Sequence, residues 1–245
     1  METVKQQYQS FFNRQIMVTD DDYAAFENKK EAMRHFAVGN NIPLAIYDMY
    51  KDKLDFLHWR VEHSYPFNYE YSTLLSYKML IHPDDRYFVM ETEKVAYNFR
   101  KNIPPNELKD YKLVYECRMK DTTGKYRRLL HQFMVIEQDG NGEIWLMLMQ
   151  LSPVVGKELE GKLHAPLMLN TKTGKSHLFK KDKFLSKREI EVVRLLALGF
   201  DSVAISERLF LSVNTVNNHR KNILYKTQTE NTAQLLLYAK TMGII

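Results

Sequence analysis

The chain has 245 residues, of which 44% are hydrophobic and 27% charged, and its formal net charge is +5. This composition is typical of a globular protein with enough apolar side chains for a sizeable core, and it excludes a largely disordered chain. The polar start, METVKQQYQS, lacks the apolar block of a signal peptide, and the longest apolar run, IWLMLM, is too short to span a bilayer. We therefore expect a cytoplasmic protein that does not associate with a membrane.

The first forty residues are predicted to be helical. An apolar-spaced run contains Phe11, Phe12 and Ile16. Thr19 and Asp22 then have the sequence of a capping box before a second helix that stops near Gly39. We therefore expect an N-terminal helical segment over residues 1–40.

The middle of the chain is predicted to be mostly strand. Two apolar runs between Leu44 and Arg60 indicate a hairpin, and a helix is expected to open at Pro83. In YKLVYECRMK, apolar and polar residues alternate, which is the period of a half-buried strand. The turns DTTG and DGNG connect it to RRLLHQFMVIE and IWLMLMQL, so we predict an antiparallel meander.

A basic stretch follows the meander. Residues 157–182 form an expected linker, in which LMLNTKTGKSHLF is predicted to be a small separate hairpin. Positive side chains are concentrated between 157 and 188 at Lys157, Lys162, Lys172, Lys175, Lys180, Lys181, Lys183, Lys187 and Arg188. Such a run suits a polyanion such as nucleic acid, and a solvated linker is the alternative.

The last part is predicted to be all helix. Ser186 and Glu189 form a capping box, Asp201 caps a second short helix, and Ser212 caps a third after a tight turn. A fourth helix is expected from Thr232 to Met242. Two short helices joined by a tight turn to a polar-faced helix make a helix-turn-helix.

The third helix, SVNTVNNHRKNIL, contains asparagines that weaken a helix because their amides compete with the backbone. At 100° per residue, five residues gather on the side away from the apolar one: Asn214, Asn217, Asn218, Lys221 and Tyr225. We expect that side to face a partner, while His219 lies at the edge of the buried side and packs.

Over residues 183–245 the sequence resembles the LuxR-type helix-turn-helix family of bacterial transcription regulators. The matching motifs are LSKREIEV at 185–192, Gly199, ISERLF at 205–210 and SVNTVNNH at 212–219, with Asn217 where a Lys is common. The resemblance implies that the third helix enters the major groove of DNA, where Asn can bond adenine and Lys can reach guanine or phosphate. The predicted DNA-binding residues are Ser212, Thr215, Asn214, Asn217, Asn218, Lys221, Lys187 and Arg188.

The last helix has two apolar stripes, of which only one is needed to cover the domain's own core. Because LuxR-type domains dimerise through this helix, the resemblance implies a homodimer, and we assign the contact to Leu235, Tyr238 and Met242. A helix buried on both sides within the chain is the alternative.

Residues 41–156 resemble a PAS sensor domain, through HPDDR before a helix and through YECRMKDTTGKYRRLL. This resemblance implies an antiparallel sheet with helices covering a pocket for a small-molecule ligand, or a dimerising module. The cofactor is unknown. We interpret Cys117 as a core residue, and His58, His63, His82 and His131 as ordinary hydrogen-bonded or exposed histidines rather than haem ligands.

The fold class is therefore α+β: a PAS-like antiparallel sheet with covering helices, and an all-α four-helix helix-turn-helix domain. The predicted function is sequence-specific binding of double-stranded DNA by a transcription regulator, with no enzymatic activity and no metal site. A signalling interaction module, or a response-regulator-like protein controlled by a protein partner, is the alternative. A phosphoacceptor domain is disfavoured because Asp20, Asp21 and Asp22 open a helix and no alternating strand and helix pattern follows.

Overall fold

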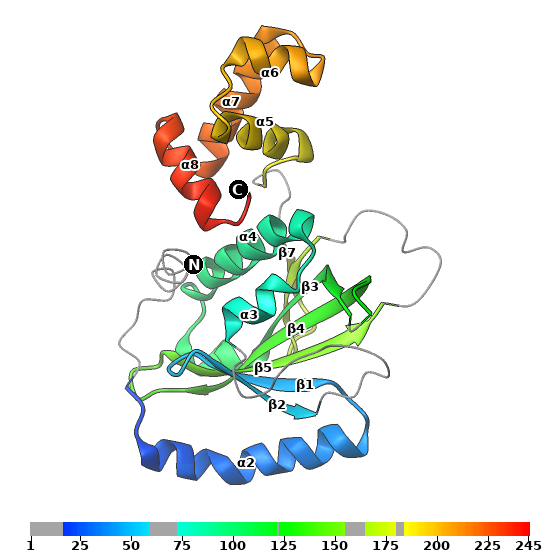
Figure 1. Ribbon diagram of the computed structural model, residues 1–245. Coiled ribbons are helices and arrows are strands. Elements are labelled where there is room, and N and C mark those ends of the chain that lie inside the picture. Colours follow the sequence, from blue (N-terminus) through cyan, green and yellow to red (C-terminus); the bar gives the residue numbers. More distant parts are fainter. Residues whose placement is uncertain (1–16, 59–72, 122, 155–164, 180–183) are drawn as a thin grey trace. The chain divides into compact units, whose positions relative to one another are not determined.

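The computed structural model describes residues 17–58, 73–121, 123–154, 165–179 and 184–245 (Figure 1). The chain divides into two compact units. The sheet unit contains Asn13–Asp85 and Thr92–Phe179, and the C-terminal unit contains Lys180–Ile245 together with Met1–Phe12 and Arg86–Glu91. The expected helix around Phe11, Phe12 and Ile16, His63 and several basic linker residues lie outside the described residues.

The sheet unit is built on one seven-stranded sheet with the order β2-β1-β5-β4-β3-β6-β7. Every neighbouring pair is antiparallel. The strands are β1 (Leu44–Asp48), β2 (Lys53–His58), β3 (Tyr111–Lys120), β4 (Tyr126–Gln138), β5 (Ile144–Pro153), β6 (Leu167–Asn170) and β7 (Ser176–Leu178). The predicted hairpin and meander are thus confirmed.

Alternation along β3 places its apolar side chains in the core. Leu113, Tyr115, Cys117 and Met119 are each at most 8% exposed. On the opposite face Glu116 is also buried, because its carboxylate forms an ion pair with Arg128 of β4 at 2.7 Å. Pairing of opposite charges across neighbouring strands is what allows a carboxylate to be buried there.

The β6–β7 hairpin confirms the predicted turn but is not separate. Strand β6 pairs with β3, with Leu113 opposite Met168, so the hairpin extends the sheet. The prediction of a separate hairpin was wrong because β3 and β6 are far apart in the chain, and a pairing at the sheet edge between such distant segments leaves no local signal in the sequence. The domain limits 41–156, 157–182 and 183–245 remain predictions.

Helices cover both faces of the sheet, with α2 on one face and α3 on the other (Figure 1). The bounds are α2 (Asp20–Gly39), α3 (Leu74–Met79) and α4 (Pro83–Arg100), followed by the 3-10 helix η1 (Pro105–Asp110). Thr19 and Asp22 form the predicted capping box of α2. Phe26 of α2 packs against Trp145 of β5 with ring centroids 6.0 Å apart, which attaches the helix to the sheet.

The C-terminal unit consists of α5 (Lys187–Ala197), α6 (Ser202–Leu209), α7 (Val213–Thr227) and α8 (Thr232–Thr241). Ser186, Asp201 and Ser212 cap the first three, as predicted. Each helix contributes a fully buried apolar side chain to one core, including Val193, Ile205, Ile223 and Leu235. None of the helices in the described ranges has the length and apolar character that a bilayer-spanning segment needs.

Candidate functional site

The polar side of α7 is exposed, as the sequence predicted. Asn214, Asn217, Asn218 and Lys221 are all exposed, whereas Val216 and Ile223 on the opposite side are 0% exposed. The apolar side therefore fixes α7 to its own unit, and the amides and the ammonium are directed to solvent. His219 is half-buried at the edge between the two sides.

The start of α7 combines a cap with free main-chain donors. Ser212 Oγ accepts a hydrogen bond from the N–H of Thr215 at 3.1 Å, and the two hydroxyl groups are 2.8 Å apart. The first turn contains no acidic side chain. A helix start with unpaired N–H groups and positive dipole potential is suited to an anion such as phosphate.

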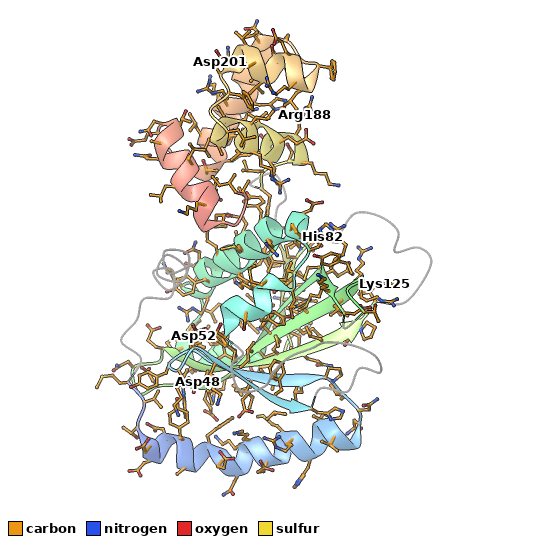
Figure 2. All side chains as sticks on the ribbon, in the orientation of Figure 1. Asp48, Asp52, His82, Lys125, Arg188 and Asp201 are labelled. Atoms are coloured by element: carbon orange, nitrogen blue, oxygen red, sulfur yellow. The ribbon has the colours of Figure 1, made fainter. Side chains whose placement is uncertain are left out.

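The two basic residues predicted on α5 have different environments. Lys187 is exposed and forms no ion pair with any described residue. Arg188, labelled in Figure 2, forms an ion pair with Glu191 at 2.7 Å and donates to the main-chain carbonyl of Leu209. Arg188 thus brings the start of α5 beside the α6–α7 turn, and its donors are already partly used within the unit.

Two cations that the sequence reading did not single out as site residues hold α7 in place. Arg220 donates to Ser202 Oγ at 2.8 Å and to Thr232 Oγ1 at 3.3 Å, which joins α7 to the first residues of α6 and α8. Lys226 lies 2.7 Å from Glu189 of α5. Burial alone would raise the pKa of Glu189, but hydrogen bonds from Lys226 and Ser186 outweigh it and lower the pKa.

Helix α8 buries most of the side that the sequence assigned to a dimer. Leu235 and Met242 are each 1% exposed in the core, so they cannot form an open apolar surface in this conformation, and Tyr238 is half-buried. The large apolar residue of α8 that is exposed is Leu237, at 57%. The helix itself lies where the sequence predicts it. The sequence does not show which of the two adjacent apolar stripes of α8 packs into the core.

A layer of polar side chains is buried in the sheet unit, among α3, α4, β3 and β4. Tyr77 Oη lies 2.8 Å from His131 Nδ1, and His131 Nε2 lies 3.1 Å from Cys117 Sγ. Tyr115 stacks on the imidazole of His131 with ring centroids 5.1 Å apart, and it donates to Glu93 at 3.1 Å. This layer is the polar part of an otherwise apolar core.

Burial sets the ionisation of this layer. It lowers the pKa of His131 to about 3 and raises the pKa of the Cys117 thiol well above its usual range. The imidazole is therefore neutral and the thiol protonated at physiological pH. Lys78, with its ammonium paired to Glu93, also has a pKa lowered by burial.

His58 and His82 also form hydrogen bonds, as expected for ordinary histidines. His58 Nε2 is 3.0 Å from Asn41 Oδ1, and His82, labelled in Figure 2, caps α4 by accepting from the N–H of Asp84. In the same motif, Asp85 forms an ion pair with Arg118 at 2.7 Å. HPDDR therefore builds a helix start. The described ranges contain no group of three or more His, Cys, Asp or Glu side chains arranged to bind a metal.

A cavity of about 330 Å³ lies between α2 and the β1–β2 hairpin. Tyr23, Phe26 and Ile46 contribute apolar surface to it, and Asp48 and Lys51 contribute charge. Asp48 accepts a hydrogen bond from the hydroxyl of Tyr23 at 2.6 Å, and Figure 2 labels it near Asp52 at the hairpin turn. The cavity offers an aromatic wall and charged groups to a small polar molecule.

Residues 183–239 match the family model described as bacterial regulatory proteins, luxR family. Among curated proteins, the oxygen regulatory protein NreC of Staphylococcus haemolyticus is 42% identical over 57 residues, which are 23% of this chain and 26% of that protein. NreC proteins of Staphylococcus epidermidis and Staphylococcus aureus match with the same identity and coverage. The match thus spans about a quarter of the length of these relatives.

Two solved structures are similar over larger parts of the chain. VqmA of Vibrio cholerae is 17% identical, over 62% of this chain and 64% of that one, with a TM-score of 0.25. SdiA of Escherichia coli is 16% identical, over 98% of both chains, with a TM-score of 0.26. TM-scores this low support no inference about this chain. The family match at 183–239 and the four capped helices of the C-terminal unit together identify this part of the chain as a LuxR-type helix-turn-helix domain.

Proposed function

We propose that the chain is a bacterial transcription regulator that binds double-stranded DNA in a sequence-specific manner through α7. The observation that carries the proposal is the exposed polar side of α7, which presents three asparagines and a lysine on a helix-turn-helix of the LuxR type. Asparagines weaken a helix, and their concentration on a solvent-facing side has a physical reason if their amides read bases. The regulator acts in the cytoplasm and requires no catalysis.

The contacts divide into two classes. Asn217 and Asn218 lie one turn into α7, where amides can reach base edges, and Lys221 contributes to base or phosphate binding. Asn214, Ser212 and Thr215 lie at the helix start, where the main-chain N–H groups favour phosphate. Lys187 adds a free cation, whereas Arg188 serves mainly to hold the α6–α7 turn, since its partners are Glu191 and Leu209.

The sheet unit is proposed to be a PAS-like sensor that binds a small-molecule ligand or mediates dimerisation. The cavity beside α2 supports the ligand, because it places hydrogen-bonding groups beside aromatic surface. We propose a homodimer, and the exposure of Leu237 makes that side of α8 the available apolar contact.

Duplex binding tests the proposal. The purified full-length chain is titrated with a pool of random-sequence duplexes at several salt concentrations, and the bound duplexes are sequenced. We expect affinity to fall steeply with salt and the bound pool to be enriched in one motif. If no duplex binds at low salt, the chain is a signalling interaction module instead. If binding occurs without enrichment, the sequence-specific role of α7 is wrong.

A further inference from the structure

Phe210 has an unusual combination of backbone conformation and exposure. It closes α6 with φ of 53° and ψ of 48°, in the left-handed region, and its side chain is 95% exposed. Glycine and asparagine adopt this conformation at much lower cost than a bulky residue. A phenylalanine at this position therefore has two free-energy costs: the left-handed backbone conformation of a bulky residue and the exposure of an apolar ring to water.

The folded unit gains little from this side chain. The next residue, Leu211, turns inward and packs on the core, so the backbone conformation directs the two neighbours to opposite sides. Single exposed apolar residues are common on protein surfaces, and exposure alone would mean nothing. The left-handed conformation itself ends α6, because the N–H of Leu211 donates to the carbonyl of Ser206 at 2.9 Å. That cap does not need an exposed aromatic side chain, so the phenylalanine itself is the feature to explain.

The surroundings of Phe210 indicate what it contacts. Arg188 donates to the carbonyl of Leu209, the residue just before it. Ser212, the cap of α7, follows two residues after it, and Val213 at the start of α7 is 38% exposed. Phe210 thus lies at the corner where the proposed phosphate-binding groups of α5 and α7 meet.

We infer that the ring of Phe210 packs against the sugar-phosphate backbone of the bound duplex beside the start of α7. This inference rests on the proposed function. The ring would cover deoxyribose C–H groups next to a phosphate held by the helix start, and it would lose its unfavourable exposure on binding. Because a sugar carries no base identity, the contact strengthens binding to every sequence and adds no selectivity.

The test compares Phe210→Asn and Phe210→Ala with the matched control Leu198→Ala, since Leu198 is 72% exposed in the same unit. Binding of a short mixed-sequence duplex is measured at several salt concentrations, with thermal unfolding of each variant. We expect both Phe210 variants to bind about tenfold more weakly, with an unchanged salt slope because no charge is lost. Phe210→Asn should unfold at the same or a higher temperature, because Asn tolerates the left-handed conformation. The control should bind like wild type.

Three outcomes would overturn the inference: wild-type affinity in Phe210→Asn, an equal loss in Leu198→Ala, or a loss of affinity that follows a loss of folding in Phe210→Asn. Failure of the proposed function is a separate result, because then the wild-type chain itself would bind no duplex at low salt.

Discussion

Lys226 of α7 and Glu189 of α5 form an ion pair across the C-terminal unit, with Nζ 2.7 Å from Oε2. Glu189 is 3% exposed and also accepts the N–H of Ser186, so one carboxylate caps α5 and holds the far end of the proposed recognition helix. The position of α7 thus depends on a charge at the start of α5.

Replacing Lys226 should therefore destabilise the unit. Lys226→Met leaves the Glu189 carboxylate buried and unpaired, and we expect a loss of about 3 kcal/mol in the free energy of unfolding. Chemical denaturation followed by helical circular dichroism measures it. Lys240→Met, at an exposed position of α8, is the matched control and should change little.

The same pair gives a pH dependence with a defined sign. The pKa of Glu189 is lowered in the folded state from its usual value of 4.5, so its contribution to stability is fully present above that pH. It is lost as the pH falls through the lowered pKa. In Lys226→Met the buried carboxylate loses the ammonium that lowers its pKa, so stability should fall less steeply on acidification. An unchanged acid limb would show that the pair contributes nothing.

Asn218 and Lys221 should differ in what their removal changes. With Asn218→Ala we expect a selected duplex to lose roughly tenfold in affinity relative to random duplexes, because a base contact disappears. With Lys221→Ala we expect weaker binding to all duplexes if its contact is to phosphate, and a salt slope smaller by about one. Asn222→Ala, also exposed on α7, is the control. Equal loss on all sequences in Asn218→Ala would exclude base reading.

The caps and turns could be predicted because their signals are local. Ser186, Asp201 and Ser212 each precede their helix by one residue, and the outward side of α7 follows from its 100° period. The Lys226–Glu189 pair joins residues 37 positions apart, and Arg220 meets hydroxyl groups from two other helices. Such contacts depend on how the helices cross, which is set by packing and leaves no spacing rule in the sequence. The pairing of β6 with β3 was missed for the same reason.

His131 should make the sheet unit less stable in mild acid. Burial lowers its pKa from 6.5 to about 3, so the unfolded chain binds one more proton than the folded one between these values. Stability is then lost as the pH falls below 6.5, by up to about 1.4 kcal/mol per pH unit. Denaturation of wild type and His131→Gln across this range should give a shallower slope for the variant. Parallel slopes would mean that His131 takes up its proton at the same pH in the folded protein as in the unfolded chain.

Thr92 offers a test in which a substitution should stabilise. The residue is 0% exposed, and its hydroxyl oxygen has no hydrogen-bond partner among the described residues. Thr92→Val keeps the shape and removes the buried hydroxyl, so we expect a gain of about 1 kcal/mol in unfolding free energy. Thr92→Ser keeps the hydroxyl and should not gain. A loss in Thr92→Val would indicate that the hydroxyl binds a ligand or a water molecule in solution.

The packing of α2 on the sheet also provides an optical signal. Trp145 lies edge-on to Tyr23 at 4.9 Å and packs against Phe26, so its indole is covered by the helix. The chain has two tryptophans, and replacing Trp59 by Phe would leave Trp145 as the single emitter. Its emission wavelength would then report whether α2 is attached to the sheet, and undocking by a ligand or partner would be visible as a red shift without any added label.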